Sequence, residues 1–461
     1  MLSETVIERL LDEAMTGGAD FAEVFDEDTF RQEAEVTGEG VEAFEAGRES
    51  GVGLRLFKDQ NCYYMSLSDR DESSLMVMAK TLTKAMKAGA ERTGRSALEP
   101  VRSFGMEEGT VRPGDLDADK RLEPARICVK AGMAHDPEIV RMKVRLTDYD
   151  QEVQIANSDG LFVRDERVKT RLYIQAYASD GKDMQVGYYG PGAMRGHDFY
   201  GQLDIEAAAC EAARQAKVIL HAAPMTGGPM SVVVGNGFGG LLFHEACGHS
   251  LEATVTARDS SEFAGKIGQM VASPCVTLID DGSIRGEWGS LHVDDEGVPT
   301  RKNILIENGI LKGYMVDRLN GLRIGLPPTG SCRRQNYRFI PVARMTNTYI
   351  APGETTPESI IRDTESGLYV ASINGGSVDP ATGDFNFSAG ECYRIRGGQI
   401  AEPVRGITLI GNGRTVLENV DRVGNDFRLG QGFCFASSGA LFIGAGQPTV
   451  RISKMTVGGI G

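Results

Sequence analysis

The sequence lacks the features that direct a chain into or across a membrane. No uninterrupted apolar run reaches the roughly 20 residues of a membrane-spanning helix. The first fifteen residues have neither the cationic start nor the apolar core of a secretory signal, because Glu4, Glu8, Asp12 and Glu13 are spread through them. We therefore expect a cytoplasmic protein that does not associate with membranes.

Closely paired cysteines are also lacking. The eight cysteines stand singly, without C-x-x-C spacing and without the density of a disulfide scaffold. They are Cys62, Cys128, Cys210, Cys247, Cys275, Cys332, Cys392 and Cys434. We expect reduced thiols, most of them small buried hydrophobic side chains, which agrees with a cytoplasmic location.

Basic residues are not in excess either. The chain has 64 Asp and Glu residues against 49 Lys and Arg residues, a formal net charge of −15. Such a charge repels phosphate backbones and anionic lipid surfaces. Nucleic acid and membrane partners are therefore not expected.

The chain does contain enough apolar material for more than one core. It has 461 residues, of which 41% are hydrophobic, and this length favours two or three domains. The breaker cluster Ala223–Pro229 marks the best boundary, so we expect an N-terminal domain at 1–222 and a C-terminal domain at 223–461. Helices and strands are segregated along the chain. This favours the α+β class, with a mixed α/β-layer N-terminal domain and a strand-rich C-terminal domain.

Apolar spacing and turn residues predict the main elements of both halves. Helices are expected at Val6–Ala14, introduced by a Thr5…Glu8 capping pattern, and at Leu75–Met86 and Leu203–Leu220. Strands are expected at Gly51–Phe57, Tyr63–Ser68 and Ser231–Val234, with hairpins at Asn308-Gly309 and Gly397-Gly398 and short helices at Pro357–Arg362 and Arg414–Val423.

The segment Phe243–His249 carries the clearest chemistry. His244 and His249 flank Glu245 in a stretch patterned like a buried helix. Imidazole is the commonest protein ligand for zinc, and a neighbouring carboxylate can take a proton from metal-bound water. This combination indicates a zinc hydrolase.

The spacing of the two histidines is unusual for such a site. The familiar H-E-x-x-H motif places its histidines at i and i+4, whereas His244 and His249 stand at i and i+5. On an ideal helix they would lie roughly 140° apart. A single wide turn would bring them onto one face, and Gly248 is where the backbone could most easily accommodate it. In a regular helix the two would instead be unrelated core or surface residues.

A hydrolytic zinc also needs a third protein ligand and an open position for water. Candidates are His292, Glu252 one turn after His249, the neighbouring Cys247, and any distant cysteine. The spacing does not choose among them.

A competing motif directly precedes the histidines. Gly235, Gly237 and Gly240 match G-x-G-x-x-G between a strand and a helix, and Asp259 follows about twenty residues later, as a dinucleotide site requires. The hairpin-rich region beyond does not supply a clear second parallel strand. The glycines could equally let the backbone pass close to the helix start.

Several segments together resemble the TldD/PmbA family of metallopeptidases. Gly239–Glu252 is similar to the signature of the family. Four further segments recur in the family's order: Asp294-Asp295-Glu296-Gly297, Arg344-Met345-Thr346-Asn347-Thr348, Gly375-Gly376-Ser377-Val378-Asp379-Pro380 and Gly446-Gln447-Pro448-Thr449. The His-Glu segment resembles the TldD side, since the PmbA (TldE) side lacks it.

The resemblance implies a specific site and activity. It implies one zinc per chain, held by His244, His249 and Cys434, with Glu245 as the catalytic base. Family members usually continue after the cysteine with a Cys-Gly-Lys-type turn, whereas Phe435–Ser438 follows here. It also implies unfolded or extended peptides as substrates, and either a homodimer or a heterodimer with a metal-free PmbA/TldE-like subunit.

Three functional classes follow from these motifs. The leading prediction is a zinc peptidase. The second is a regulatory or peptide-binding protein with a structural metal in a closed, four-ligand site. The third is a dinucleotide-binding oxidoreductase that uses the glycine motif.

Overall fold

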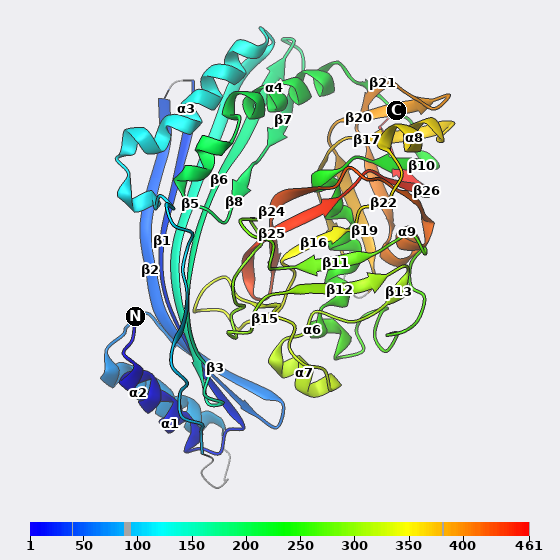
Figure 1. The fold of residues 1–461 in the computed structure, drawn as a ribbon. Helices are drawn as coiled ribbons and strands as arrows, with labels where there is room; N and C mark the ends of the chain where they lie inside the picture. Colours follow the sequence, from blue (N-terminus) through cyan, green and yellow to red (C-terminus); the bar gives the residue numbers. More distant parts are fainter. Residues whose placement is uncertain (39, 87–93, 380–381, 461) are drawn as a thin grey trace.

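The computed structural model describes residues 1–38, 40–86, 94–379 and 382–460. These residues form an α+β fold, as the sequence predicts, with sheets of eight, ten, six and two strands. The eight-stranded sheet, here called the first sheet, stands as a tall curved layer beside a more compact body built from residues 223–460, here called the second half (Figure 1).

The first sheet is dominated by four long antiparallel strands. Its order is β3-β2-β1-β5-β6-β4, and β7 and β8 also pair with β6. The strands are β1 (Phe21–Thr37), β2 (Gly40–Lys58), β3 (Asn61–Leu67), β4 (Arg102–Phe104), β5 (Ile139–Asn157), β6 (Phe162–Ser179), β7 (Met184–Tyr189) and β8 (Gly192–Ala193). With 17 to 19 residues, β1, β2, β5 and β6 are about three times as long as a typical strand. Each of these strands is long enough for helices to pack against both ends of the sheet and for the second half to pack against the stretch between those ends.

Two helix pairs cover the two ends of the first sheet (Figure 1). The helices are α1 (Glu4–Met15) and α2 (Glu72–Met86) at one end, and α3 (Ala118–His135) and α4 (Ile205–His221) at the other. Each pair shares a separate hydrophobic core with the strands beneath it. The capping prediction for the first helix is wrong: Ser3 is the N-cap and accepts from the amide of Val6. Ser3 offers the same hydroxyl acceptor as Thr5, two residues earlier, so the helix begins there.

The second half contains the two larger remaining sheets. The ten-stranded sheet has the order β18-β19-β22-β26-β10-β17-β20-β21-β9, with β23 also on β26, and the six-stranded sheet has the order β13-β12-β11-β16-β25-β24. The strands are β9 (Ala223–Pro224), β10 (Gly228–Val234), β11 (Leu278–Asp281), β12 (Lys302–Glu307), β13 (Ile310–Leu311), β14 (Cys332–Arg333), β15 (Val342–Ala343), β16 (Asn347–Ile350), β17 (Ser366–Val370), β18 (Ile373–Val378), β19 (Asp384–Ala389), β20 (Cys392–Arg396), β21 (Gln399–Arg405), β22 (Thr408–Asn412), β23 (Val420–Val423), β24 (Arg428–Ala436), β25 (Gly439–Gln447) and β26 (Val450–Gly458).

Short helices complete the second half. They are α5 (Leu241–Phe243), α6 (Ala253–Thr256), α7 (Arg318–Ile324), α8 (Pro357–Arg362) and α9 (Gly413–Asn419). The prediction of α8 is confirmed to the residue. The helix expected over 414–423 is shorter, because its last four residues pair with β26 as β23.

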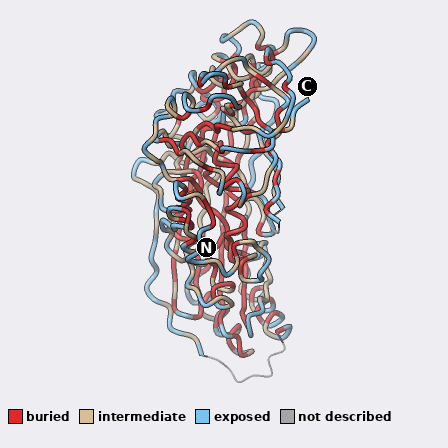
Figure 2. The backbone as a smooth tube through the Cα atoms, turned by 90° about the vertical axis from the view of Figure 1, so that its right-hand side faces the viewer, coloured by how far each residue is buried: buried red, intermediate tan, exposed pale blue. Residues whose placement is uncertain are grey.

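The histidine-bearing segment lies in the largest core of the molecule. The turn at His244–Gly248 contacts β16 of the six-stranded sheet and β18 and β19 of the ten-stranded sheet, and His249 contacts Cys434 on β24, so the segment runs between the two sheets. Phe243, Ala246 and Cys247 belong to this core and are at most 1% exposed. Buried chain runs through the middle of the molecule, with exposed segments around it (Figure 2). The segment is therefore packed between the two sheets.

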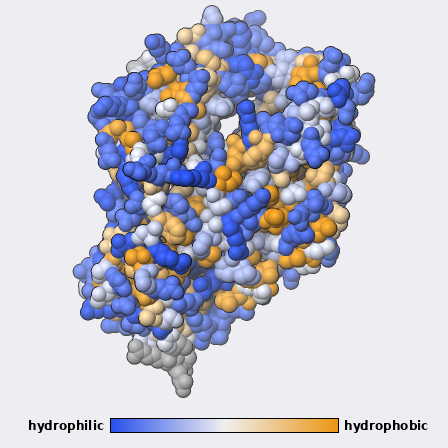
Figure 3. Space-filling view, viewed as in Figure 1, coloured by the Kyte–Doolittle hydropathy of each residue, from blue (hydrophilic) through white to orange (hydrophobic). Residues whose placement is uncertain are grey.

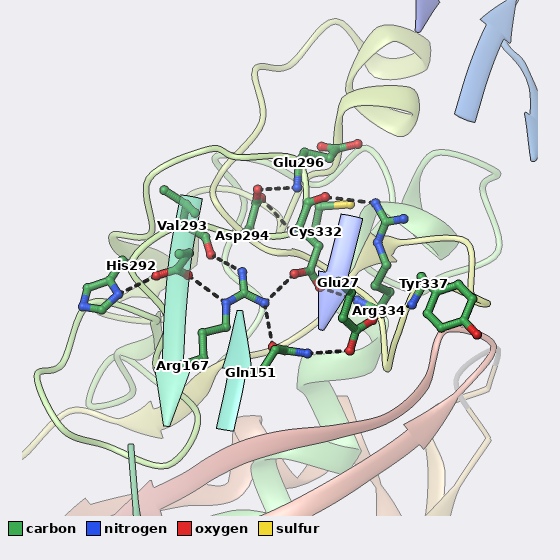
Figure 4. Close-up of polar contacts among 12 residues, drawn as sticks. Glu27, Gln151, Arg167, His292, Val293, Asp294, Glu296, Cys332, Arg334 and Tyr337 are labelled. Atoms are coloured by element: carbon green, nitrogen blue, oxygen red, sulfur yellow. Dashed lines mark hydrogen bonds and ion pairs between the residues drawn. The ribbon is translucent and has the colours of Figure 1, made fainter. Parts of the chain in front are cut away.

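Buried charges join the first sheet to the second half. Arg55 on β2, 1% exposed, donates to Glu23 on β1 and to Glu296, both at 2.7 Å. Arg167 on β6 donates to Asp295 at 2.7 Å, and Figure 4 shows this part of the network. A buried charge that loses its partner costs about 3–5 kcal/mol. These pairs therefore hold the loop that carries Asp295 and Glu296 against the sheet.

The face seen in Figure 3 is largely hydrophilic, and an opening is visible between the first sheet and the second half. No helix in the described ranges combines the length and the apolar character needed to cross a bilayer.

Candidate metal centre

The backbone changes its winding at His244. The α-helical Leu241–Phe243 is followed by a π-helical turn at His244–Gly248 and then by a 3₁₀ turn at His249–Leu251. The wide turn predicted from the i, i+5 spacing is therefore confirmed. It brings the two imidazole rings edge to face, with centroids 5.3 Å apart and an interplanar angle of 84°. Both histidines now lie on one side of the segment, as a shared ligand would require.

Gly248 serves this turn in a different way from the one expected. Its φ of −57° is ordinary for a helix, so the conformational freedom of glycine is not needed here. Instead, a Cβ atom at this position would lie 2.1 Å from Sδ of Met345. A side chain at this position would press on the buried Met345, which packs directly against the backbone of the turn.

Cys434 completes the cluster from a distant part of the chain. It lies on β24, paired with Leu441 on β25, and its Sγ atom is 3.1 Å from Nε2 of His249. One ligand atom from each of His244, Glu245, His249 and Cys434 can be chosen so that all lie within 4.8 Å of one another. The structure thus brings together the four residues named from the resemblance.

The other candidates for a third ligand lie elsewhere. Cys247 is fully buried in the apolar core, and burial raises the pKa of its thiol well above the ordinary value. His292 is part of the contact between the first sheet and the second half: its Nδ1 lies 2.7 Å from Asp165, and its ring stacks on Phe104. Glu252 contacts His249 from the side, with Oε1 3.0 Å from Nδ1.

His244 provides the strongest local sign of a ligand. It is 0% exposed, and neither ring nitrogen has a hydrogen-bond partner among the described residues. Burial lowers the pKa of His244 well below its ordinary value, and nearby His249, Arg344 and Arg333 lower it further. The ring is therefore neutral, with a lone pair for a cation. A buried polar group without a hydrogen-bond partner is costly. The unpaired nitrogens of His244 therefore indicate that this ring binds a ligand.

His249 has a different electrostatic environment. Burial alone lowers the pKa of His249, but the charges of Glu252 and Cys434 outweigh it and raise the pKa well above its ordinary value. Because Glu252 faces Nδ1, the Nε2 atom points into the cluster. A carboxylate behind a metal-binding histidine is the usual way of fixing its tautomer and orientation. Metal binding here must release the second proton of the ring.

Glu245 is the most accessible member of the cluster. Its side chain is 19% exposed, and Oε2 lies 3.5 Å from Nε2 of His249. Burial raises the pKa of Glu245, and the negative charge of Glu252 raises it further. A carboxylate at the edge of a nitrogen and sulfur cluster can exchange protons with solvent and with a neighbouring reactant.

The donor set fits a borderline-soft divalent ion. Two imidazole nitrogens and a thiolate are ligands that zinc takes readily, and three protein ligands are typical of catalytic rather than structural zinc. The unpartnered His244 agrees with this assignment, because a bound cation would satisfy its free nitrogen. Within the described residues, the four-residue cluster is the single group of this kind.

The spacing of residues in the sequence does not indicate Arg344, which also contacts the cluster. Its Nη2 atom donates to Sγ of Cys434 at 3.0 Å. The one available signal was that Arg344 begins a segment that recurs in the family, which says nothing about where its side chain lies.

The glycine motif does not have the context of a dinucleotide site. After β10 the next strand, β11, lies in the other sheet, and the parallel neighbour of β10 is the much later β17. Asp259 is exposed in a turn rather than at a strand end. Gly240 is needed for packing, since a Cβ there would lie 2.4 Å from the backbone of Gly446. The alternative reading of these glycines, close backbone approach at the helix start, agrees with the structure.

Comparison with known protein families identifies the class. The model of the PmbA/TldA metallopeptidase central domain matches residues 112–220, and that of the PmbA/TldA metallopeptidase C-terminal domain matches residues 227–459. Together these matches cover more than half of the chain, which belongs to the PmbA/TldD family of metallopeptidases.

Individual relatives agree with this assignment. A protein of Haemophilus influenzae named metalloprotease TldD homolog is 39% identical over 351 residues, which are 75% of this chain and 73% of that protein. A protein of the same name from Buchnera aphidicola is 33% identical over 429 residues, 89% of this chain and 87% of the relative. A metalloprotease of Methanothermobacter thermautotrophicus is 32% identical, with 91% of both chains covered.

Solved structures share the fold. A protein of Thermotoga maritima superposes with a TM-score of 0.80 at 21% identity, covering 98% of this chain and 99% of its own. TldE of Thermococcus kodakarensis superposes with a TM-score of 0.76 at 20% identity, covering 98% and 100%.

Proposed function

We propose that this chain is a zinc-dependent peptidase that hydrolyses unfolded or extended peptides, with one zinc per chain. His244, His249 and Cys434 would hold the ion. The observation that carries the proposal is the fully buried His244: its two ring nitrogens lack hydrogen-bond partners within the described chain, and one of them lies within 4.8 Å of a ligand atom of Cys434 and of His249. Membership in a metallopeptidase family supports it.

In this proposal each residue of the cluster has its own task. When bound, zinc supplies a Lewis acid that makes water more acidic and a carbonyl more electrophilic. Glu245 takes the proton of the attacking water and passes it to the amine of the departing peptide, and its partial exposure lets it reach both. Glu252 holds His249 in the orientation that presents Nε2.

The neighbourhood of the cluster favours an extended substrate. Strand β18 is an edge strand of the ten-stranded sheet and contacts the π-helical turn that carries His244. Its residues Asn374, Gly376 and Ser377 are exposed. An extended peptide that adds to such an edge is bound through its backbone, so little sequence preference is expected.

A zinc titration with a peptide substrate tests the proposal. The protein is stripped with a chelator, zinc is restored in steps, and cleavage of an unstructured peptide is followed by mass spectrometry. We expect cleavage to rise with zinc and to level off at one ion per chain, while a stably folded protein remains intact. Cleavage that persists at the same rate without metal would contradict the proposal.

A second function is favoured by one observation. Glu245 lies within the same 4.8 Å group as the three ligands, so it could serve as a fourth ligand and close the site. The chain would then be a regulatory or peptide-binding protein with a structural metal. In that case zinc removal lowers the melting temperature, and bound peptides are recovered intact with or without zinc.

We also propose the assembly and compartment implied by the family resemblance. The chain acts as a homodimer or with a metal-free PmbA/TldE-like subunit. The β2 segment from Gly40 to Arg48 supports an assembly, because it is exposed and pairs only with β1 in the described sheet. All eight cysteines lie in the described ranges and are free thiols, which supports a location in the reducing cytoplasm. Sedimentation of the purified chain, alone and with a metal-free relative, tests the assembly.

A further inference from the structure

Arg344 is a buried cation with three polar partners at the metal cluster. It follows β15 directly and is 1% exposed. Its Nη2 donates to Sγ of Cys434 at 3.0 Å, and its Nη1 donates to Oγ of Ser438 at 3.2 Å. Its Nε lies 3.4 Å from Oε1 of Glu252, in an ion pair without a hydrogen bond.

These partners come from separate parts of the chain. Cys434 and Ser438 belong to the hairpin of β24 and β25, whereas Glu252 follows the histidine-bearing segment. The backbone amide of Arg344 is itself fixed, since it donates to the carbonyl of Ser331 at 2.8 Å. A planar guanidinium can hold several acceptors in one rigid arrangement, which a lysine ammonium cannot do. Arg344 therefore ties the hairpin to the histidine segment.

Two of the three partners act on the metal cluster. Cys434 is a ligand in the proposed function, and Glu252 orients the ligand His249 through Nδ1 at 3.0 Å. We propose that Arg344 is a positioning residue that holds the sulfur of Cys434 and the carboxylate of Glu252 in register, and that its hydrogen bond draws charge away from the sulfur. This inference rests on the proposed function of the cluster.

The proposed hydrogen bond has an electronic consequence. A thiolate donates more charge to a cation than an imidazole does, which weakens the cation as a Lewis acid. A charged donor 3.0 Å from the sulfur reduces that donation. Arg344 thus lets a cysteine serve as a ligand at a site that must still activate water. A purely structural arginine would have no effect on the electronic state of the sulfur.

Cobalt provides a direct readout of this effect. Co²⁺ replaces zinc in the full-length protein, and the sulfur-to-cobalt charge-transfer band is recorded for wild type, Arg344→Gln and Arg344→Lys. We expect the band of Arg344→Gln to move to lower energy. We expect its affinity for Zn²⁺, measured against a chromophoric chelator, to fall by roughly 10–100-fold, as is typical when a group behind the ligands is lost. For peptide cleavage, kcat should fall while KM stays unchanged. The band energy, zinc affinity and kcat of Arg344→Lys should lie between those of the wild type and those of Arg344→Gln.

Arg334 supplies a matched control. It is also a buried arginine paired with a glutamate, Glu23, at 2.8 Å, but it does not contact the four-residue cluster. We expect Arg334→Gln to lower the melting temperature and to leave the cobalt band in place.

The outcomes separate this inference from the proposed function. A folded Arg344→Gln with the wild-type band and wild-type zinc affinity would overturn the role of Arg344. If Arg344→Gln does not fold, the test uses Arg344→Lys instead. A lysine variant with the wild-type cobalt band and the wild-type zinc affinity would then overturn the role of Arg344. A wild-type protein that binds Co²⁺ without any sulfur band would instead contradict ligation by Cys434 itself.

Discussion

The Sγ atom of Cys434 lies 3.1 Å from Nε2 of His249, although 185 residues separate them in the chain. Two sheets create this proximity. The six-stranded sheet carries the cysteine on β24, and the histidine segment packs between this sheet and the ten-stranded one. The cluster is therefore a product of the complete second half rather than of a local motif.

Removing the sulfur tests its role as a ligand. Cys434→Ala should weaken zinc binding by more than the roughly 10–100-fold typical of changes behind the ligands, because one of three direct donors is lost. The control is Cys247→Ala, which removes a fully buried thiol two residues before His249 but outside the cluster. It should lower stability and keep zinc affinity. Chelator competition measures both variants, and equal affinities would count against ligation by Cys434.

Filling the space at Gly248 tests the packing of the wide turn. Gly248→Ala would place a methyl group 2.1 Å from Sδ of Met345, so we expect a loss of about 1–3 kcal/mol in stability from overpacking. Met345→Ala makes room for that methyl group. Urea unfolding of both single variants and of the double variant should show a double-mutant loss smaller than the sum of the single losses. Additive losses would mean that the two residues do not press on each other.

The buried Asp148 predicts a pH dependence of stability that is independent of the metal. Burial raises the pKa of Asp148 from 3.8 to about 6, and its Oδ2 has no hydrogen-bond partner among the described residues. The folded state therefore holds this proton more tightly than the unfolded state. The stability that it contributes is present below about pH 4 and is lost as the pH rises through about 6, a change of about 3 kcal/mol.

Asp148→Asn isolates this contribution because asparagine does not titrate. The stability of the wild type minus that of the variant should fall by about 3 kcal/mol between about pH 4 and about pH 7. Urea unfolding of both proteins across this range measures the difference. A difference that stays constant with pH would contradict the assignment.

The sequence was sufficient for those features that depend on local pattern. Apolar spacing and turn residues placed α1, α2, α4 and α8, and the i, i+5 spacing of His244 and His249 indicated a wide turn as one of two possibilities. Local pattern also placed the strand that precedes the glycine motif of Gly235, Gly237 and Gly240. These features could be predicted because each depends on residues within a few turns of one another.

Other features depend on contacts that a sequence does not display. The long strands β1 and β5 carry many polar and charged residues, and several of these are buried, for example Asp26 and Asp148, so a simple alternation of apolar and polar residues does not reveal their full length. The close packing at Gly248 comes from Met345, almost a hundred residues later. Arg344 has no spacing relation to Cys434 or Glu252. Cys434 itself was named from the family resemblance, and no spacing in the chain would have selected it over Cys247.

Peptide cleavage by Glu245→Gln at full zinc occupancy tests the central claim most directly. Zinc content is measured on the same samples, so that a lost ligand is distinguished from a lost base. The account predicts one zinc per chain in both proteins and a cleavage rate lower in the variant by on the order of 10²–10⁴. A variant that binds zinc equally well and cleaves the peptide at the wild-type rate would contradict the account.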